Sequence, residues 1–299
     1  MFNLKPAEIT DKSWVDLLNR QSDFRGCEHN FTNIFIWSTV YNSCIAQRDG
    51  FLVVRSRCED PVYLYPTGSG DLQSIIAAMR DDAHKNGKQL EIIGTTNENQ
   101  QELDALFPGK FTYEPMRESF DYIYNIESLI SLSGKKLHGK RNHINNFVAA
   151  YSDWTFEPIT PDNLMECFDM NTEWSRENHA DSNGGLMQEN TAIQKCFDHY
   201  AELELEGGLL RLDGKIIAYT IGEVLSSDTY NTHIEKAFSD IQGAYPLINR
   251  EFAAYVKSIH PEMRYINREE DLGFEGLRHA KLSYQPAILL EKSRAVYQD

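Results

Sequence analysis

The feature that most constrains the fold is a strand–helix–strand pattern that recurs along the chain. In the first half, residues 51–55 and 62–65 are rich in apolar and aromatic side chains and bounded by turn residues, which predicts two strands. After Asp71, apolar residues recur at helical spacing until Gly87, and residues 90–93 predict another strand. A strand, a helix and a strand within about 30 residues indicate an α/β unit.

The second half repeats this pattern. Residues 208–224 predict a hairpin, because two apolar runs flank the turn sequence Asp213-Gly214. A strand is expected at residues 229–236, followed by a helix that opens at Pro246 and by a short strand at residues 264–267. The prediction is an α/β (α+β) chain with mixed sheets flanked by helices.

The length predicts two domains. The chain has 299 residues, which is room for two domains of about 150 residues each. Residues 128–134 are small and polar, as is typical of a connection. We therefore expect an N-terminal domain over residues 1–130 and a C-terminal domain over residues 131–299.

Charge and cysteine content exclude several classes of protein. The formal net charge is −16, from 29 basic and 45 acidic residues, which repels polyanions and argues against DNA binding. The five cysteines are scattered without a CxxC pair, so neither a disulfide framework nor a metal site is expected. Reduced thiols in a cytoplasmic protein are the simplest interpretation of these residues, Cys27, Cys44, Cys58, Cys167 and Cys196.

Membrane insertion and secretion are not expected from the sequence. The first residues contain no apolar core of the kind found in signal peptides. No apolar run approaches the roughly 18 residues that a transmembrane helix needs. We therefore predict a protein without a transmembrane segment.

The first candidate site is a basic segment at residues 134–143. It contains Lys135, Lys136, Lys140 and Arg141 with no acidic residue, in a chain that is otherwise strongly negative. An amphipathic helix continues from it, so side-chain charge and free N–H groups could bind a phosphate or carboxylate together. The alternative is a solvated charged face.

The second candidate is the strand at residues 230–236. Strict alternation places Asn231, His233 and Glu235 on one face of the sheet. Polar groups on a central, helix-covered strand must be paired or line a cleft, where a histidine or glutamate could act as a general base. The alternative is an edge strand with one solvated face.

The third candidate is the segment at residues 267–281, where charges alternate after a strand end. Ligands of open α/β sheets collect at strand ends. Glu269 and Asp271 could orient an amine or take its proton. Basic side chains could hold an anionic group; these are Arg268, Arg278 and Lys281. The alternative is a structural network of ion pairs.

Taken together, several segments resemble an uncharacterised bacterial family related to the C-terminal catalytic domain of phosphatidylglycerol lysyltransferase. The detailed resemblance covers about residues 130–290, and the N-terminal half is similar more loosely. The segments that carry it are Lys135-Lys-Leu-His-Gly-Lys-Arg-Asn-His-Ile144, His233-Ile-Glu-Lys-Ala237, Gly243-Ala-Tyr245 with Leu247-Ile-Asn249, Asn267-Arg-Glu-Glu-Asp-Leu-Gly273 and Lys281-Leu-Ser-Tyr284.

The resemblance implies a tandem GNAT-like fold, shared with the Fem transferases. It also implies transfer of an aminoacyl group from aminoacyl-tRNA to a lipid or peptide, while more distant relatives use acyl-CoA. The acetyltransferase phosphate loop would place Asp240, Gly243 and Tyr245, of which only the glycine matches. The lysyltransferase carries a membrane segment that we do not expect here, so its lipid acceptor does not follow from the resemblance.

We therefore predict an acyltransferase or aminoacyltransferase with no permanently bound cofactor. The donor would be aminoacyl-tRNA or acyl-CoA, and the acceptor a small molecule, lipid or peptide with an amine or hydroxyl. Glu235 or Asp271, alone or with His233, would remove the proton. The other predicted contacts are Lys135, Lys140, Arg141, Asn231, Arg268, Glu269, Arg278 and Lys281.

This prediction requires that the three segments converge on one enclosed hollow. The alternatives are a non-catalytic ligand-binding protein with the same fold, or a hydrolase that uses Glu269 and Asp271 as paired carboxylates. The sequence leaves the oligomeric state open.

Overall fold

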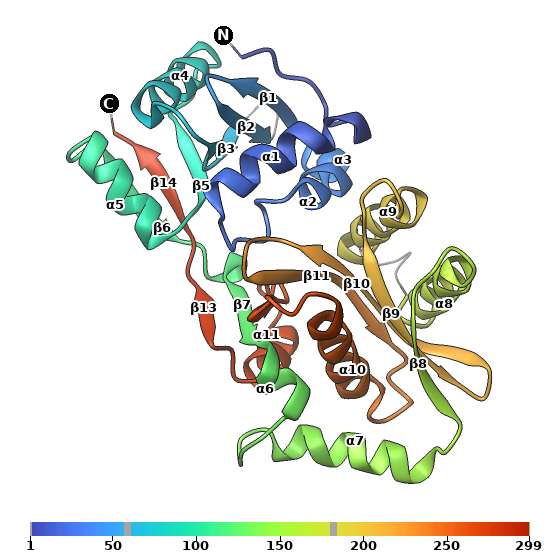
Figure 1. Ribbon diagram of the computed structural model, residues 1–299. Helices are drawn as coiled ribbons and strands as arrows, with labels where there is room; N and C mark the ends of the chain where they lie inside the picture. Colours follow the sequence, from blue (N-terminus) through green and yellow to red (C-terminus); the bar gives the residue numbers. More distant parts are fainter. Residues whose placement is uncertain (1, 57–60, 180–183, 299) are drawn as a thin grey trace. The chain divides into compact units, whose positions relative to one another are not determined.

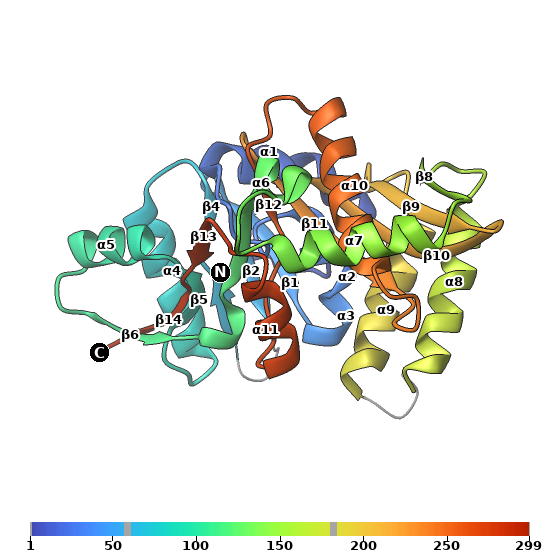
Figure 2. The same cartoon turned by 90° about the horizontal axis from the view of Figure 1, so that it is seen from below.

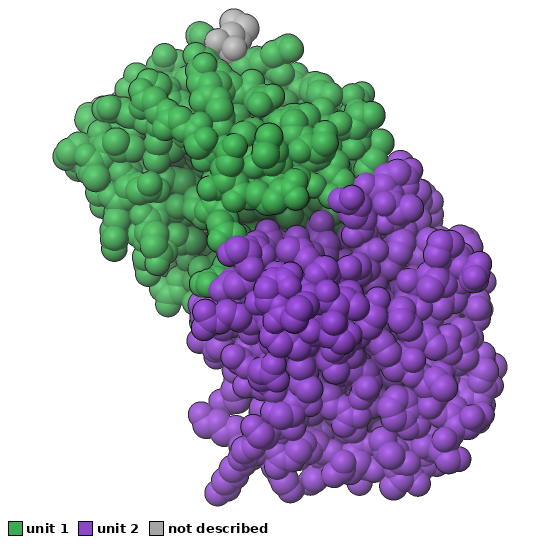
Figure 3. Space-filling view, in the orientation of Figure 1, with its two compact units in different colours: residues 1–121, 270–275, 289–299 green, residues 122–269, 276–288 purple. Residues whose placement is uncertain are grey.

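A computed structural model describes residues 2–56, 61–179 and 184–298, which form two compact units (Figure 1). Unit 1 comprises Met1–Asp121, Glu270–Glu275 and Leu289–Asp299; unit 2 comprises Tyr122–Glu269 and Gly276–Ile288 (Figure 3). Each contains a mixed sheet with helices. Within these ranges, none of the helices has both the length and the apolar character that a membrane span requires.

The sheet of unit 1 has the strand order β1-β2-β3-β5-β14-β6, with β4 paired to β2. Among the described strands, β3 and β5 pair in parallel, and the other pairs are antiparallel. Its strands are β1 (Cys44–Arg48), β2 (Phe51–Ser56), β3 (Val62–Leu64), β4 (Thr67–Gly68), β5 (Glu91–Thr95), β6 (Phe111–Pro115) and β14 (Ser293–Tyr297). Its helices are α1 (Lys12–Ser22), α2 (Phe31–Ile36), α3 (Ser38–Tyr41), α4 (Leu72–Lys85) and α5 (Asn97–Leu106), with 3₁₀ turns η1 (Ile9–Asp11) and η2 (Arg117–Ser119).

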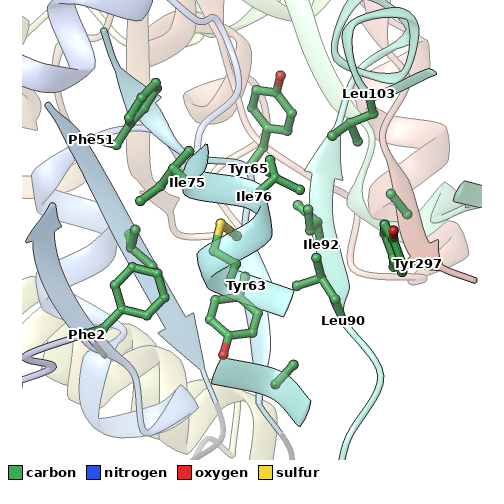
Figure 4. Packing of buried hydrophobic residues seen from close by; sticks show 14 of the residues in the cluster. Phe2, Phe51, Tyr63, Tyr65, Ile75, Ile76, Leu90, Ile92, Leu103 and Tyr297 are labelled. Atoms are coloured by element: carbon green, nitrogen blue, oxygen red, sulfur yellow. The ribbon is translucent and has the colours of Figure 1, made fainter. Parts of the chain in front are cut away.

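Helix α4 shows how local sequence builds this unit. The Asp71 side chain accepts a hydrogen bond from the Ser74 N–H and so caps the first turn. Ile75, Ile76 and Met79 are fully buried and pack on the sheet in the core shown in Figure 4. The helix and strands predicted for residues 51–93 are therefore confirmed.

The chain returns to unit 1 at its end. Strand β14 pairs antiparallel with both β5 and β6, so the last residues lie inside the first sheet. The compact units are thus not consecutive in sequence, whereas the predicted domains 1–130 and 131–299 are. Strand β14 has only five residues, and its sequence alone does not indicate which sheet it joins.

The sheet of unit 2 has the order β13-β7-β12-β11-β10-β9-β8. Strands β8 to β11 pair antiparallel, and β11 pairs in parallel with β12. The strands are β7 (Asp121–Asn125), β8 (Trp154–Pro158), β9 (Glu206–Leu212), β10 (Lys215–Val224), β11 (Thr229–Ala237), β12 (Tyr265–Asn267) and β13 (Ile288–Leu290). The helices are α6 (Ile126–Ser131), α7 (His138–Ala150), α8 (Leu164–Glu177), α9 (Gly184–Asp198), α10 (Ala244–Ile259) and α11 (Glu275–Leu282).

The predicted hairpin is confirmed as β9–β10. Its two turn residues, Asp213 and Gly214, have φ values of 48° and 80°. Positive φ at both central residues matches the right-handed twist of the two strands. Helix α10 packs on this sheet with α7 beside it (Figure 2).

Helix α10 begins at Ala244, two residues before the predicted start at Pro246. Gly243 precedes it with φ of 98°, where α7 comes close. A Cβ at this position would lie 2.6 Å from the His143 carbonyl oxygen and 2.8 Å from the Phe147 Cβ. Close packing of α7 against α10 therefore depends on a glycine.

We expect Gly243→Ala to lower the free energy of unfolding by at least about 2 kcal/mol, because the added methyl group meets both a left-handed backbone and the α7 backbone. The control is Gly139→Ala in α7, where nothing lies within 4 Å of the new Cβ. That change should stabilise the protein by about 0.5–1 kcal/mol. Urea unfolding of both variants measures the difference, and an equal effect would contradict the packing argument.

Candidate functional site

Strand β11 carries the candidate site, but its side chains do not alternate as expected. The register with β10 shifts at this point: Ile221 is opposite Ile234, while Gly222 is opposite Thr232. His233 is the extra residue of a β-bulge, and a bulge re-aims the side chains that follow it.

The bulge separates Glu235 from Asn231 and His233. The Tyr230 ring, before the bulge, packs on Phe252 of α10 with ring centroids 5.8 Å apart. Glu235 also reaches α10, where its carboxylate accepts a hydrogen bond from Asn249. Strict alternation would place positions 230 and 235 on opposite faces. The prediction that positions 231, 233 and 235 share one face is therefore wrong.

Glu235 belongs to a group that we call the Arg268 cluster. Glu235 Oε1 accepts a 2.6 Å hydrogen bond from Arg268 Nη2, and Oε2 accepts one of 3.2 Å from Asn249 Nδ2. The side chains of Glu235 and Arg268 are only 12% and 13% exposed. The cluster consists of Tyr124, Lys140, Glu235, Asn249, Arg268 and Tyr284.

Two tyrosine rings and a second cation complete the Arg268 cluster. The Arg268 guanidinium lies 4.8 Å from the ring centroid of Tyr284 and 5.6 Å from that of Tyr124. The Lys140 ammonium lies 4.1 Å from the Tyr284 centroid. Burial, followed by repulsion from Arg268, lowers the pKa of Lys140. Burial works against the charge of Arg268, but Glu235 outweighs it and raises the pKa of the guanidinium.

Two buried atoms of this cluster stand out. In the described part of the chain, Arg268 Nη1 and Asn249 Oδ1 have no hydrogen-bond partner. One is a donor and the other an acceptor, and both belong to residues that bind the Glu235 carboxylate. An unfilled buried polar atom costs about 1–3 kcal/mol, which a ligand with a matching acceptor and donor would offset.

A hollow of about 260 Å³ opens beside Lys140, within unit 2. Lys140 and His143 line it from α7. The segment 238–246, except Asp240 and Ala244, lines it from the loop before α10 and from the first turn of that helix. Gly243 and Tyr245 of the predicted phosphate loop are among these lining residues. Positive charge and the N-terminal end of a helix thus face the same space.

His233 and Asn231 form a second group, which we call the His233 clamp. His233 Nε2 lies 2.9 Å from Glu223 Oε1, and Nδ1 lies 3.0 Å from Glu269 Oε1. Asn231 Nδ2 donates to the same Glu269 oxygen at 2.7 Å. Burial alone would lower the pKa of His233, but its hydrogen bonds to the two glutamates raise it to about 9.

The remaining predicted residues lie in other surroundings. Lys135 is exposed, and Arg141 donates to the carbonyl oxygens of Leu132 and Gly134. Lys281 is buried and donates to the carbonyl oxygen of Arg268, while Arg278 is half-buried on α11.

Asp271 lies in unit 1 and not with Glu235 in unit 2. It is fully buried, and its Oδ2 accepts a 2.8 Å hydrogen bond from Arg117 Nη1. Each of the three predicted segments therefore contributes one side chain to the Arg268 cluster: Lys140, Glu235 and Arg268. The second and third segments also meet in the His233 clamp.

Sequence reasoning missed four residues of these groups. Tyr284 and Asn249 lie in segments that carry the family resemblance, but the sequence assigned neither residue a role. Tyr124 and Glu223 are in strands β7 and β10, where the local sequence gave no sign of a site. Only the pairing of β12 with β7 and of β10 with β11 brings these two side chains near the site.

Unit 1 contains a buried group of charges around Lys292. Its ammonium lies 2.5 Å from Glu28, 2.8 Å from Asp121 and 3.5 Å from Glu270. Burial opposes the charge of Lys292, but Asp121 and its neighbours raise its pKa well above the usual value.

The side chains of Cys27, Asp121 and Glu270 have ligand atoms within 4.8 Å of one another, a spacing that could hold a metal ion. The Lys292 ammonium already contacts both carboxylates and lies 3.7 Å from the Cys27 sulfur. The Lys292 ammonium thus occupies the place of a cation in this group. Among the described residues, Cys27, Cys44, Cys167 and Cys196 form no disulfide, and Cys58 lies outside these residues.

A family model described as phosphatidylglycerol lysyltransferase, C-terminal, matches residues 19–296. The chain belongs to this family. The predicted relationship is thereby confirmed.

Solved structures show the same fold. A conserved protein of unknown function from Bacteroides thetaiotaomicron is 38% identical, with a TM-score of 0.94 over 100% of both chains. L-PGS from Bacillus licheniformis is 14% identical, with a TM-score of 0.67 over 98% of this chain and 94% of that one. FemX is 9% identical, with a TM-score of 0.63 over 98% and 96%.

The predicted fold class, two GNAT-like units of mixed sheets flanked by helices as in the Fem transferases, is confirmed. The fold is that of acyl- and aminoacyltransferases. The chain also matches an uncharacterized protein of Mycoplasmoides gallisepticum at 23% identity over 196 residues, which span 58% of that protein's length.

The charge group in unit 1 leads to a test of stability. We expect Lys292→Met to lower the free energy of unfolding by about 3–5 kcal/mol, because it leaves buried carboxylates without their cation. Lys136→Met, which removes an exposed ammonium, is the control and should change stability by less than about 0.5 kcal/mol. Denaturant unfolding of both variants measures this, and similar values would show that Lys292 is not the compensating charge.

Proposed function

We propose that the protein transfers an aminoacyl group from an activated ester, such as aminoacyl-tRNA, to an amine or hydroxyl acceptor. The observation that carries this proposal is the pair of unfilled atoms in the Arg268 cluster, the donor Arg268 Nη1 and the acceptor Asn249 Oδ1. An aminoacyl ester offers a carbonyl oxygen to the first and an α-ammonium to the second. A plain acyl group offers only the oxygen.

The charges of the cluster suit this chemistry. Arg268 Nη1 would donate to the carbonyl oxygen, where negative charge develops as the acceptor attacks. The Glu235 carboxylate lies beside both partners and would offset the positive charge of the α-ammonium. Lys140 and the start of α10 face the adjacent hollow and would hold the anionic part of the donor.

The transfer step forms one bond and breaks another. The acceptor nitrogen or oxygen bonds to the acyl carbon, and the ester C–O bond breaks with its electron pair on the leaving oxygen. Glu235 would take the acceptor's proton and return it to that oxygen. His233 is not assigned this task, since an imidazole with a pKa of about 9 holds its proton at neutral pH. Asp271 is not assigned it either, because it pairs with Arg117 in unit 1.

A binding experiment tests the substrate class. The probes are 3′-aminoacylamido-adenosine, which does not hydrolyse, and the same compound without its α-amino group. We expect the first to bind at least about tenfold more tightly, because a site with an unfilled buried acceptor rejects an analogue that lacks the donor. Asn249→Leu should remove this preference and Arg268→Lys should weaken both probes. The control is Arg250→Lys. Like Asn249, Arg250 lies in α10, but it pairs with Glu251, so this change should leave the binding of both probes unaltered.

Turnover tests the reaction itself. Purified protein would be given aminoacyl-tRNA with phospholipid vesicles or peptide amines as acceptors. Glu235→Gln should slow transfer by about 10²–10⁴-fold at saturating donor, where weaker binding of the α-ammonium no longer limits the rate. Equal binding of the two probes would contradict the aminoacyl assignment. Preferential binding without any transfer would favour the alternative, a binding protein that keeps the transferase fold.

A further inference from the structure

We infer that His233 is a positioning residue, whose imidazole holds Glu269 in place and, through Glu269, the guanidinium of Arg268. The role of Arg268 as a donor to the substrate carbonyl rests on the proposed function, whereas its positioning by His233 and Glu269 does not. The geometric claim concerns how the two buried groups of unit 2 are coupled.

The His233 ring is held at both nitrogens. Each nitrogen faces a carboxylate oxygen at 2.9–3.0 Å, and the side chain is 1% exposed. Because a carboxylate accepts but cannot donate, both nitrogens carry hydrogens and the ring is an imidazolium. The ring joins Glu223 of β10 to Glu269 after β12.

The groups around the ring come from each neighbouring element. Glu223 faces it from β10, Asn231 from β11 itself and Glu269 from the segment after β12. Cys196 of α9 is buried nearby, and its pKa is raised first by burial and then by Glu223 and Glu269. The two carboxylates keep the proton on His233, against the effect of burial, up to a pKa of about 9.

Glu269 connects this ring to Arg268. Its backbone has φ of 56°, a left-handed conformation that costs a non-glycine residue about 1–2 kcal/mol. The conformation is held by the side-chain bonds to His233 and Asn231 and by the Glu269 N–H, which donates to Asn267 Oδ1 at 2.7 Å. If His233 releases Glu269, this backbone can relax.

Arg268 directly precedes that strained residue. Its N–H donates to the Tyr122 carbonyl oxygen, and its side chain reaches across to Glu235 and the two tyrosine rings. A rotation of the backbone at position 269 therefore changes the path of the chain next to position 268. The expected consequence is loss of the stacked position over Tyr284.

The stacked position has a spectroscopic signature. The Arg268 guanidinium carbon lies 4.8 Å from the Tyr284 ring centroid and 5.6 Å from that of Tyr124. The NMR signals of the side-chain protons next to the guanidinium should therefore show an upfield ring-current shift, and Arg268→Lys identifies these signals. We expect His233→Gln to lose at least half of this shift. The matched control is His260→Gln, which breaks a histidine–glutamate pair with Glu206 at 2.8 Å in the same unit and should leave the shift unchanged.

A pH series on the wild-type protein gives a second measurement. The Arg268 shift should fall as the pH rises through about 9, with the same midpoint as the His233 ring signals. The two tyrosines should stay un-ionised in this range, because burial raises the pKa of both. The series decides the question if His233→Gln does not fold, as judged by far-UV circular dichroism.

Two results would overturn the inference. One is an unchanged Arg268 shift in folded His233→Gln; the other is a constant shift while His233 titrates. Neither NMR measurement uses a substrate, so both can be interpreted even if the transfer assay shows no activity. Conversely, transfer activity with an unaltered Arg268 shift would reject the positioning role and keep the proposed function.

Discussion

The ion pair between Glu235 and Arg268 is the interaction on which the candidate site depends. Both side chains are almost fully buried, so each would be costly without the other. The pair links strand β11 to the segment after β12, and Asn249 adds helix α10. The guanidinium of Arg268 also lies over the rings of Tyr124 and Tyr284. The Glu235 carboxylate therefore ties β11 to the segment after β12 and to α10.

A single extra residue in β11 allows the same strand to contribute to both the Arg268 cluster and the His233 clamp. The bulge at His233 turns Glu235 toward α10 and leaves Asn231 and His233 with Glu223 and Glu269. Without it, one face of the strand would carry all three side chains. The two groups meet again at the neighbouring residues 268 and 269, which is why they can be coupled.

The two units contrast in how they use buried charge. In unit 1, Lys292 contacts three carboxylates, so its ammonium charge is compensated from within the chain, although Glu28 Oε1 has no hydrogen-bond partner among the described residues. In unit 2, the Arg268 cluster keeps a donor and an acceptor unfilled among the described residues and lies next to a hollow lined by Lys140. Membership of the lysyltransferase family gives the fold of both units, and the hollow beside the Arg268 cluster is the reason that we propose a substrate site in unit 2.

The sequence by itself determined what depends on neighbouring residues: the Asp71 cap of α4, the Asp213-Gly214 turn, and the basic segment that begins α7. It also identified Lys140, Glu235 and Arg268 as residues of interest. The tertiary structure alone decided that Asp271 pairs with Arg117, that β14 joins the first sheet, and that a bulge sends Glu235 to α10. Each of these depends on which distant strand or side chain is opposite, and spacing along one chain carries no information about that register.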